Sequence, residues 1–217
     1  MASSDHILTA DQVNANVSYL RTKRIIDIIG SLLGIIFLSP LFILVAILIK
    51  IEDPKGPVFF KQVRVGKAET EFHMYKFRSM VSDAEERLKD LLALNEVSGA
   101  MFKMKDDPRI TRIGKFIRKT SIDELPQLWN VLKGDMSLVG PRPPLLREVE
   151  EYTSYDKQRL LVTPGCTGLW QVSGRNETSF SQMVELDLIY IKKSTIFFDL
   201  KILVKTVLVL ISGKGAY

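Results

Sequence analysis

The chain contains few of the residues that form disulfides or soft-metal sites. Cys166 is the only cysteine among its 217 residues, so the chain can form neither an intrachain disulfide nor a cysteine-rich zinc site. Its two histidines, His6 and His73, lie far apart in the sequence, which argues against a histidine-rich metal site or a paired-histidine mechanism. Any bound metal should therefore be a hard cation held by oxygen atoms, and magnesium (Mg2+) is the obvious candidate where phosphates are handled.

The chain also lacks internal repeats, low-complexity linkers and an obvious second domain. With 46% hydrophobic and 25% charged residues, it is large enough for one domain with a real core plus a membrane element. Its net charge of +5 suits an anionic partner, which could be lipid headgroups, a nucleoside diphosphate or nucleic acid. Charge alone does not choose among these partners.

One long apolar segment runs from Ile25 to Ile49. Its 25 residues would reach ~37 Å as a helix, enough to cross a hydrocarbon core of ~30 Å. A secretory signal peptide fits poorly, because 24 residues precede the segment and no small-residue cleavage site follows it. The segment therefore predicts a membrane element.

Basic residues flank this segment on both sides: Arg21, Lys23 and Arg24 before it, and Lys50, Lys55, Lys61, Arg64 and Lys67 after it. Positive charge marks the cytoplasmic side, so the pattern favours a segment that returns to the side it entered. Pro40 removes the hydrogen bond to the Ile36 carbonyl, and a bend at Ser39-Pro40 would allow a re-entrant helix over residues 23–52. A kinked transmembrane helix and a buried core helix of a soluble protein are the alternatives.

We expect an N-terminal extension over residues 1–22 and a cytosolic-face catalytic domain over residues 53–217. Val-, Phe- and Tyr-rich runs from Pro57 to Val65 and from Thr70 to Phe77, around a Gly66-Lys67 turn, predict a β-hairpin. A capping box of Ser82 and Glu85 predicts a helix that continues to about Asn95.

Two further helices are predicted to lie on a surface. The segment Arg109 to Lys119 repeats apolar residues at helical spacing opposite a basic face, which is typical of an amphipathic helix on an anionic interface. The solvated face of a soluble helix is the alternative. The segment Leu200 to Ile211 is apolar with two interspersed lysines and predicts a second surface helix.

The adjacent carboxylates Asp123 and Glu124 have two interpretations. Ser121 and Glu124 match a capping box, so both acids could simply stabilise the first turn of a helix running toward Lys133-Gly134. Ionised carboxylates beside fixed cations also suit phosphate chemistry, in which the aspartate attacks phosphorus and the glutamate holds a metal.

Nearby arginines favour the phosphate interpretation. Arg118 precedes the acids by five residues, and Arg142 stands between Pro141 and Pro143. The prolines hold Arg142 in a stiff extended segment, which prepares its guanidinium for bidentate phosphate contact. The glycine-punctuated segment 164–176 adds Arg175, although it could equally be a turn-rich core connection anchored by Trp170.

Several motifs in order resemble the bacterial sugar transferase family, the monotopic phosphoglycosyl transferases. The match extends from about Lys23 to the C-terminus and rests on the runs Tyr75–Met80, Asp107–Gly114, Asp123–Gln127, Gly140–Pro143 and Trp170–Asn176. Such a set of ordered motifs is highly specific. The family includes small members and larger ones with four further transmembrane helices and another domain upstream.

The resemblance implies a fold and a site. The fold class is α+β, a largely helical single catalytic domain with a short β-hairpin, a re-entrant membrane helix bent at Ser39-Pro40 and amphipathic surface helices. Asp123 would be the covalent nucleophile and Glu124 a magnesium ligand. Phosphate or nucleotide contacts would come from three arginines: Arg118, Arg142 and Arg175.

The resemblance also implies an activity. A phosphosugar would pass from a UDP-sugar to polyprenol phosphate, typically undecaprenyl phosphate, through an aspartyl-phosphosugar intermediate with release of UMP. This reaction would initiate exopolysaccharide, capsule, O-antigen or glycoconjugate synthesis on the cytoplasmic face of the bacterial inner membrane. Membrane lipids are expected partners, nucleic acid is not, and a homodimer is left open. The alternative function is a noncatalytic basic scaffold on the membrane surface.

Overall fold

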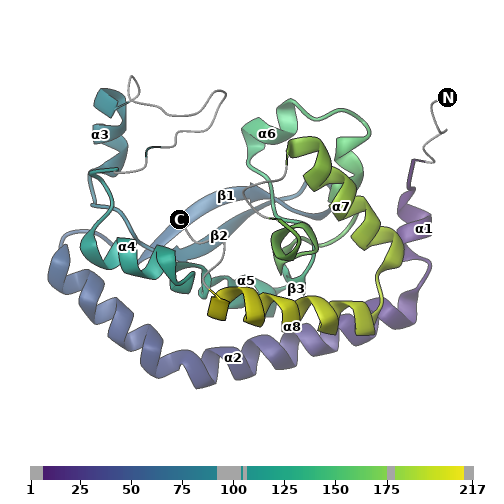
Figure 1. The fold of residues 1–217 in the computed structure, drawn as a ribbon, viewed down its shortest axis with the longest axis horizontal. Coiled ribbons are helices and arrows are strands. Elements are labelled where there is room, and N and C mark those ends of the chain that lie inside the picture. Colours follow the sequence, from purple (N-terminus) through teal and green to yellow (C-terminus); the bar gives the residue numbers. More distant parts are fainter. Residues whose placement is uncertain (1–6, 92–103, 105–106, 175–178, 213–217) are drawn as a thin grey trace.

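The computed structural model describes residues 7–91, 104, 107–174 and 179–212. It is mostly helical, as expected, with two small sheets, and Figure 1 shows the long helix α2 running beneath the other elements. The helices are α1 (Ala10–Asn14), α2 (Val17–Glu52), α3 (Ala84–Leu91), α4 (Arg112–Lys119), α5 (Gln127–Lys133), α6 (Leu146–Glu150), α7 (Phe180–Lys193) and α8 (Ile196–Ser212). The 3-10 turns are η1 (Lys67–Glu69), η3 (Ile122–Glu124), η4 (Asp156–Leu161) and η5 (Trp170–Val172). The strands are β1 (Phe59–Val65), β2 (Glu71–Phe77), β3 (Ser137–Val139) and β4 (Gly165–Thr167).

Helix α2 contains the predicted membrane segment and begins several residues before it, at an Asn16 cap that accepts from the Tyr19 N–H. The helix continues through Pro40, and the Ser39 hydroxyl donates a 2.7 Å hydrogen bond to the Ile36 carbonyl, which the proline leaves without its usual partner. Figure 1 shows that α2 changes direction along its length. Serine therefore satisfies the backbone group that the proline frees.

Within the described part of the chain, α2 is the one helix long and apolar enough to cross a membrane. Only 11% of its most apolar 18-residue stretch is buried against the rest of the protein. Many large apolar side chains of α2 are exposed, among them Ile25, Ile29, Leu33, Ile36, Phe37, Ile43, Leu44, Ile47 and Ile51. A soluble core helix would bury such a surface, so this alternative fits the structure poorly.

The N-terminal half of α2 packs on the elements that follow it through small and polar residues. A Cβ atom at Gly30 would lie 2.8 Å from Leu138, and one at Gly34 would lie 3.0 Å from Leu128. The Asp27 carboxylate accepts hydrogen bonds from the Ser137 hydroxyl and the Leu138 N–H, at 3.0 and 2.9 Å. The two glycines thus let α2 approach α5 and β3 closely.

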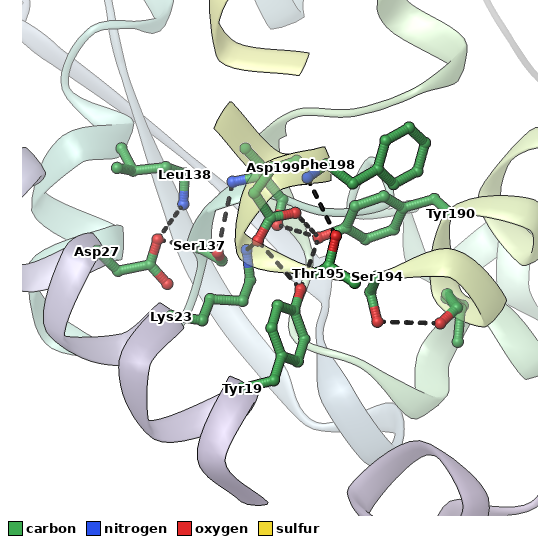
Figure 2. Close-up of polar contacts among 12 residues, drawn as sticks. Tyr19, Lys23, Asp27, Ser137, Leu138, Tyr190, Ser194, Thr195, Phe198 and Asp199 are labelled. Atoms are coloured by element: carbon green, nitrogen blue, oxygen red, sulfur yellow. Dashed lines mark hydrogen bonds and ion pairs between the residues drawn. The ribbon is translucent and has the colours of Figure 1, made fainter. Parts of the chain in front are cut away.

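The N-terminal part of α2 is also anchored to α8 by a buried polar network. Asp199 accepts from Lys23 at 2.8 Å, from Tyr19 at 3.0 Å and from Tyr190 at 2.8 Å, and Figure 2 shows these groups converging. Arg24 donates to the Val131 and Leu132 carbonyls at the end of α5. Two of the basic residues that flank the apolar segment therefore make contacts within the protein.

The predicted hairpin is confirmed. Strands β1 and β2 pair antiparallel from Phe59 opposite Phe77 to Val65 opposite Glu71. Helix α5 docks on β2 through the fully buried Asn130, whose side chain accepts from the Tyr75 N–H at 3.0 Å and donates to the His73 carbonyl at 2.7 Å. One asparagine thereby fixes the helix that follows the two acids against the hairpin.

The predicted helices differ from the observed ones at their ends. Helix α3 covers Ala84–Leu91, and the rest of the predicted span to Asn95 lies outside the described residues. Helix α4 begins at Arg112 rather than Arg109, because the Thr111 hydroxyl caps it by accepting from the Gly114 N–H. The C-terminal helix is longer than predicted and runs from Ile196 to Ser212.

A second, parallel sheet was not predicted. Strands β3 and β4 pair Ser137 with Gly165 and Val139 with Thr167. A Cβ atom at Gly165 would lie 2.0 Å from the Gly140 nitrogen, so glycine is required at this close approach of two backbones. The sheet places the Pro141-Arg142-Pro143 segment directly after β3.

Candidate active site

The two acids lie in the 3-10 turn η3, between α4 and α5. The predicted capping box is wrong: Ser121 is left-handed at φ 55°, and its side chain makes no capping hydrogen bond. The left-handed residue turns the chain out of α4 into η3, and α5 begins only at Gln127, after Pro126. Helix α5 does end at Lys133, with Gly134 at φ 98° as its cap.

Asp123 is a buried carboxyl group, with 8% of its surface exposed. Burial raises the pKa of Asp123 to about 6, the positive charges of Lys76 and Arg118 oppose this rise, and the negative charge of Glu124 adds to it. At neutral pH the Asp123 carboxyl group is therefore ionised in most molecules, and the ionised group is poorly solvated. Such a carboxylate is suited to act as a nucleophile.

Glu124 forms an ion pair with a residue that the sequence analysis did not assign to the site. Lys76 Nζ lies 2.6 Å from Glu124 Oε1, and the Glu124 side chain is 43% exposed. Lys76 belongs to β2, so the hairpin delivers a cation to both acids. Its membership of the Tyr75–Met80 motif was the one signal that could have identified it.

Arg118 lies beside the acids as predicted. Its Nε atom donates to the Ser79 hydroxyl at 2.9 Å, and its charge opposes the rise in the Asp123 pKa. Helix α4 is held close to Ser79, because the Thr111 N–H donates to the Ser79 carbonyl and a Cβ atom at Gly114 would lie 1.9 Å from that oxygen. The position of Arg118 thus depends on a glycine contact.

The end of α2 also orients α4. The Glu52 carboxylate accepts from the Arg112 N–H at 2.7 Å and from the Ile113 N–H at 3.0 Å, so it caps the first turn of α4. Helix α2 and the helix that carries Arg118 are therefore directly linked. This link could not be predicted from the sequence, because the whole hairpin lies between the two segments.

Arg142 is partly exposed and forms a loose ion pair, with its Nη1 atom 3.5 Å from Glu148 Oε2. The buried side chain of Arg64 is close enough to Arg142 to be affected by its charge. Burial and the positive charge of Arg142 lower the pKa of Arg64 to about 10, while the negative charges of Glu148 and Glu124 oppose this change. Arg64 is therefore within electrostatic reach of both Arg142 and Glu124.

Arg175 lies outside the described residues. The described part of its segment supports the core-connection interpretation, because Leu169 and Val172 pack against a buried cluster that includes Val184 and Leu188. The Gln171 amide donates to the Cys166 carbonyl at 3.3 Å.

The acids offer a limited set of ligands for a metal ion. No group of three or more His, Cys, Asp or Glu side chains is arranged for metal binding within the described ranges. Mg2+ commonly uses one or two carboxylates and takes its other ligands from substrate phosphates and water. The exposed carboxylate of Glu124, next to Asp123, fits this mode of binding.

Comparison with known proteins identifies the family to which the chain is similar. The family model described as bacterial sugar transferase matches residues 18–213. The chain is 52% identical over 200 residues to galactosyl transferase CpsE of Streptococcus agalactiae, covering 92% of this chain and 44% of that protein. It is 48% identical over 199 residues to undecaprenyl-phosphate galactose phosphotransferase of Salmonella typhimurium, covering 90% of this chain and 41% of that protein.

A third relative is nearer in length. Exopolysaccharide production protein ExoY of Rhizobium meliloti is 39% identical over 199 residues, which cover 90% of this chain and 88% of that protein. The chain spans less than half the length of the first two relatives. From the family model and these identities, the chain belongs to the bacterial sugar transferase family.

Proposed function

We propose that the protein is a phosphoglycosyl transferase that moves a sugar phosphate from a UDP-sugar to undecaprenyl phosphate and releases UMP. The reaction would be the first membrane step of surface-polysaccharide synthesis. Family membership supports this reaction class, and the Salmonella relative is named for undecaprenyl phosphate and galactose. The single observation that carries the proposal is the buried Asp123 beside Glu124, Lys76 and Arg118, with no side-chain cap from Ser121.

The reaction consists of two displacements at one phosphorus atom. A carboxylate oxygen of Asp123 attacks the β-phosphorus of the UDP-sugar, and the bond from that phosphorus to the bridging oxygen breaks. UMP leaves with the bonding electrons. A phosphate oxygen of the lipid then attacks the phosphosugar-aspartate, and the carboxylate of Asp123 leaves unchanged. Both steps balance without an oxidant or reductant.

The cations around Asp123 suit the charge of the substrate. Lys76 and Arg118 already act on the Asp123 carboxylate, and they can shift their interaction to the diphosphate as it binds. We assign Arg142 and Arg175 to contacts with the phosphates or the nucleotide. Arg142 is partly exposed and stands on a proline-restricted segment, which favours a fixed bidentate contact.

Glu124 is the residue that would hold Mg2+. The ion, when bound, neutralises charge on the diphosphate, so that a carboxylate can approach phosphorus. Lys76 pairs with Glu124 in this structure. Its positive charge therefore balances the charge of the carboxylate and holds the carboxylate in one orientation.

We also propose that the protein is monotopic, with α2 entering and leaving the bilayer on the cytoplasmic face of the inner membrane. The exposed apolar surface of α2 and the exposed Phe116 of α4 support this arrangement. Helix α8 adds further exposed apolar residues: Phe197, Leu200, Val204, Val207, Leu208 and Leu210. Together these helices present apolar surface where a lipid substrate would arrive.

The test is UMP release by the purified protein with undecaprenyl phosphate, Mg2+ and a panel of UDP-sugars, with analysis of the lipid product. The proposal predicts that one or a few UDP-sugars give UMP and a lipid-linked diphosphosugar in equal amounts. Absence of UMP with every sugar tested, from a folded protein that binds vesicles, would favour the noncatalytic scaffold instead.

A further inference from the structure

The segment Pro141–Pro144 is held by four hydrogen bonds from separate parts of the fold. Its carbonyls accept from Gly165 N at 2.8 Å, Arg159 Nη2 at 3.3 Å, Arg64 Nη1 at 3.1 Å and Val65 N at 3.0 Å, in chain order. The three prolines have no N–H to donate, so each of them can form a backbone hydrogen bond only through its carbonyl. Every carbonyl of the four residues is engaged.

Two of the four donors are buried arginine side chains rather than backbone groups. The Arg159 side chain is 0% exposed, and its Nη2 atom lies 2.5 Å from Asp187 Oδ2, whose side chain is 1% exposed. Its Nη1 atom donates to the Tyr152 hydroxyl at 2.8 Å. Arg159 is thus fixed from two sides, with Nη2 directed to the Arg142 carbonyl as well.

Arg64 is fixed in a similar way. It is 6% exposed, donates from Nη2 to the Gln62 side chain at 2.7 Å and donates from Nη1 to the Pro143 carbonyl. Strand β1, the turn η4 and helix α7 therefore all contribute to holding the backbone on either side of one exposed guanidinium, that of Arg142.

The Arg159–Asp187 pair is poorly suited to a purely stabilising role. Among the described residues, Arg159 Nε and Asp187 Oδ1 are buried without a hydrogen-bond partner. A buried ion pair with unsatisfied atoms is weak evidence for stability, since apolar residues of similar volume often serve as well. What apolar residues cannot supply is the hydrogen bond to the Arg142 carbonyl.

We propose that Arg159, oriented by Asp187, and Arg64 are positioning residues that fix the backbone of Arg142 and so aim its guanidinium at the substrate phosphate. This inference rests on the proposed function, because it requires Arg142 to contact the phosphates or nucleotide. A bidentate guanidinium contact is strongly directional, so a small rotation of the 141–144 backbone would weaken it.

The test is a mutant cycle on UMP release. The double variant Arg159→Met/Asp187→Leu removes both buried charges together, which avoids leaving one of them unpaired. We expect it to lower kcat/KM for the UDP-sugar by about tenfold to a hundredfold, mainly through KM, with little change in Tm. In an Arg142→Ala background the same double change should alter kcat/KM by less than about twofold, because the group being aimed is gone.

A matched control lies on the same turn. Lys157 and Glu69 form an exposed ion pair, with Lys157 Nζ 3.0 Å from Glu69 Oε2. The variant Lys157→Met/Glu69→Leu should keep kcat/KM within about twofold of wild type. A loss in this control equal to that of the buried pair would contradict the inference.

Arg159→Lys provides a second cycle if the double variant does not fold. Its ammonium can still pair with Asp187 but cannot reproduce the planar fork that also reaches Tyr152 and the Arg142 carbonyl. A lower kcat/KM that disappears in the Arg142→Ala background would support the inference. Equal losses with and without Arg142, from an active wild type, would overturn the inference alone, whereas a wild type that releases no UMP would overturn the proposed function and the inference together.

Discussion

Lys76 Nζ lies 2.6 Å from Glu124 Oε1, so the β-hairpin supplies the cation that faces the two acids of η3. The relationship depends on Asn130, which joins α5 to the backbone of β2 and thus sets the register between Lys76 and the acids. The site is therefore built where a strand edge, a 3-10 turn and helix α4 meet.

The first prediction concerns Lys76. Lys76→Met should lower turnover at least tenfold, because it removes a charge that acts on both Asp123 and Glu124 and lowers the Asp123 pKa. Its effect on the free energy of unfolding should be below about 1 kcal/mol, since the pair is partly exposed. Steady-state UMP release and thermal unfolding measure the two effects. Lys133→Met, which removes the similar Lys133–Asp135 pair, is the control and should leave turnover unchanged.

The second prediction concerns Glu124 and magnesium. Glu124→Gln should lower turnover sharply and raise the Mg2+ concentration needed for half-maximal rate, because the amide lacks the charge that attracts the ion. Folding should change little, since the Glu124 side chain is partly exposed. A Mg2+ titration of UMP release tests this, and an unchanged titration curve would exclude Glu124 as a ligand.

The third prediction concerns the path of α2. Single cysteines near Arg21 and near Lys55, in a Cys166→Ser background, should both react only with reagent added on the cytoplasmic side. Pro40→Leu should restore the helix hydrogen bond that Ser39 now replaces and shift some molecules toward spanning the membrane. Labelling of one cysteine from outside in the unmodified helix would show a span rather than a re-entrant path.

The fourth prediction follows from the pKa of Asp123. Because folding raises that pKa from its ordinary value of 3.8 to about 6, the folded state binds a proton more tightly than the unfolded state. The stability associated with this proton is present below about pH 4 and is lost as pH rises through about 6. Asp123→Asn should therefore be more stable than wild type at pH 7.5, by at most about 3 kcal/mol, and equally stable near pH 4.

Chemical denaturation of both proteins at the two pH values measures this difference. Asp187 also has a pKa raised to about 6 by burial, opposed by Arg159, but it is present in both proteins and cancels in the comparison. The same ionisation predicts that wild-type kcat/KM rises with pH through about 6. Equal stability of the two proteins at pH 7.5 would show that Asp123 is not held in an unfavourable environment.

Local patterns predicted the elements that depend on local chemistry. Val-, Phe- and Tyr-rich runs around a Gly66-Lys67 turn predicted the hairpin, and the apolar run predicted α2, since each pattern is set by neighbours in sequence. The proximity of Arg118 to Asp123 was also predicted, because only five residues separate them. The capping box failed, since Ser121 adopts a left-handed conformation that its residue type does not signal.

Long-range contacts were not predictable from one sequence. Lys76 and Glu124 are 48 positions apart, and Arg159 and Asp187 are 28 positions apart, so only the folded chain brings each pair together. Strands β3 and β4 have three residues each, too few to show a period of two. Arg24 and Arg64 were counted as flanking charges, but their side chains donate to backbone carbonyls inside the protein.

The central claim is that Asp123 forms a covalent bond to the phosphosugar, and intact-protein mass spectrometry tests it most directly. The protein is incubated with its UDP-sugar and Mg2+ but without lipid acceptor, then digested to locate any adduct. The account predicts a mass increase equal to one phosphosugar on the peptide containing Asp123, release of UMP before lipid is added, and no adduct in Asp123→Asn. Turnover of Asp123→Asn at the wild-type rate, or UMP release only when both substrates are present with no adduct trapped, would contradict it.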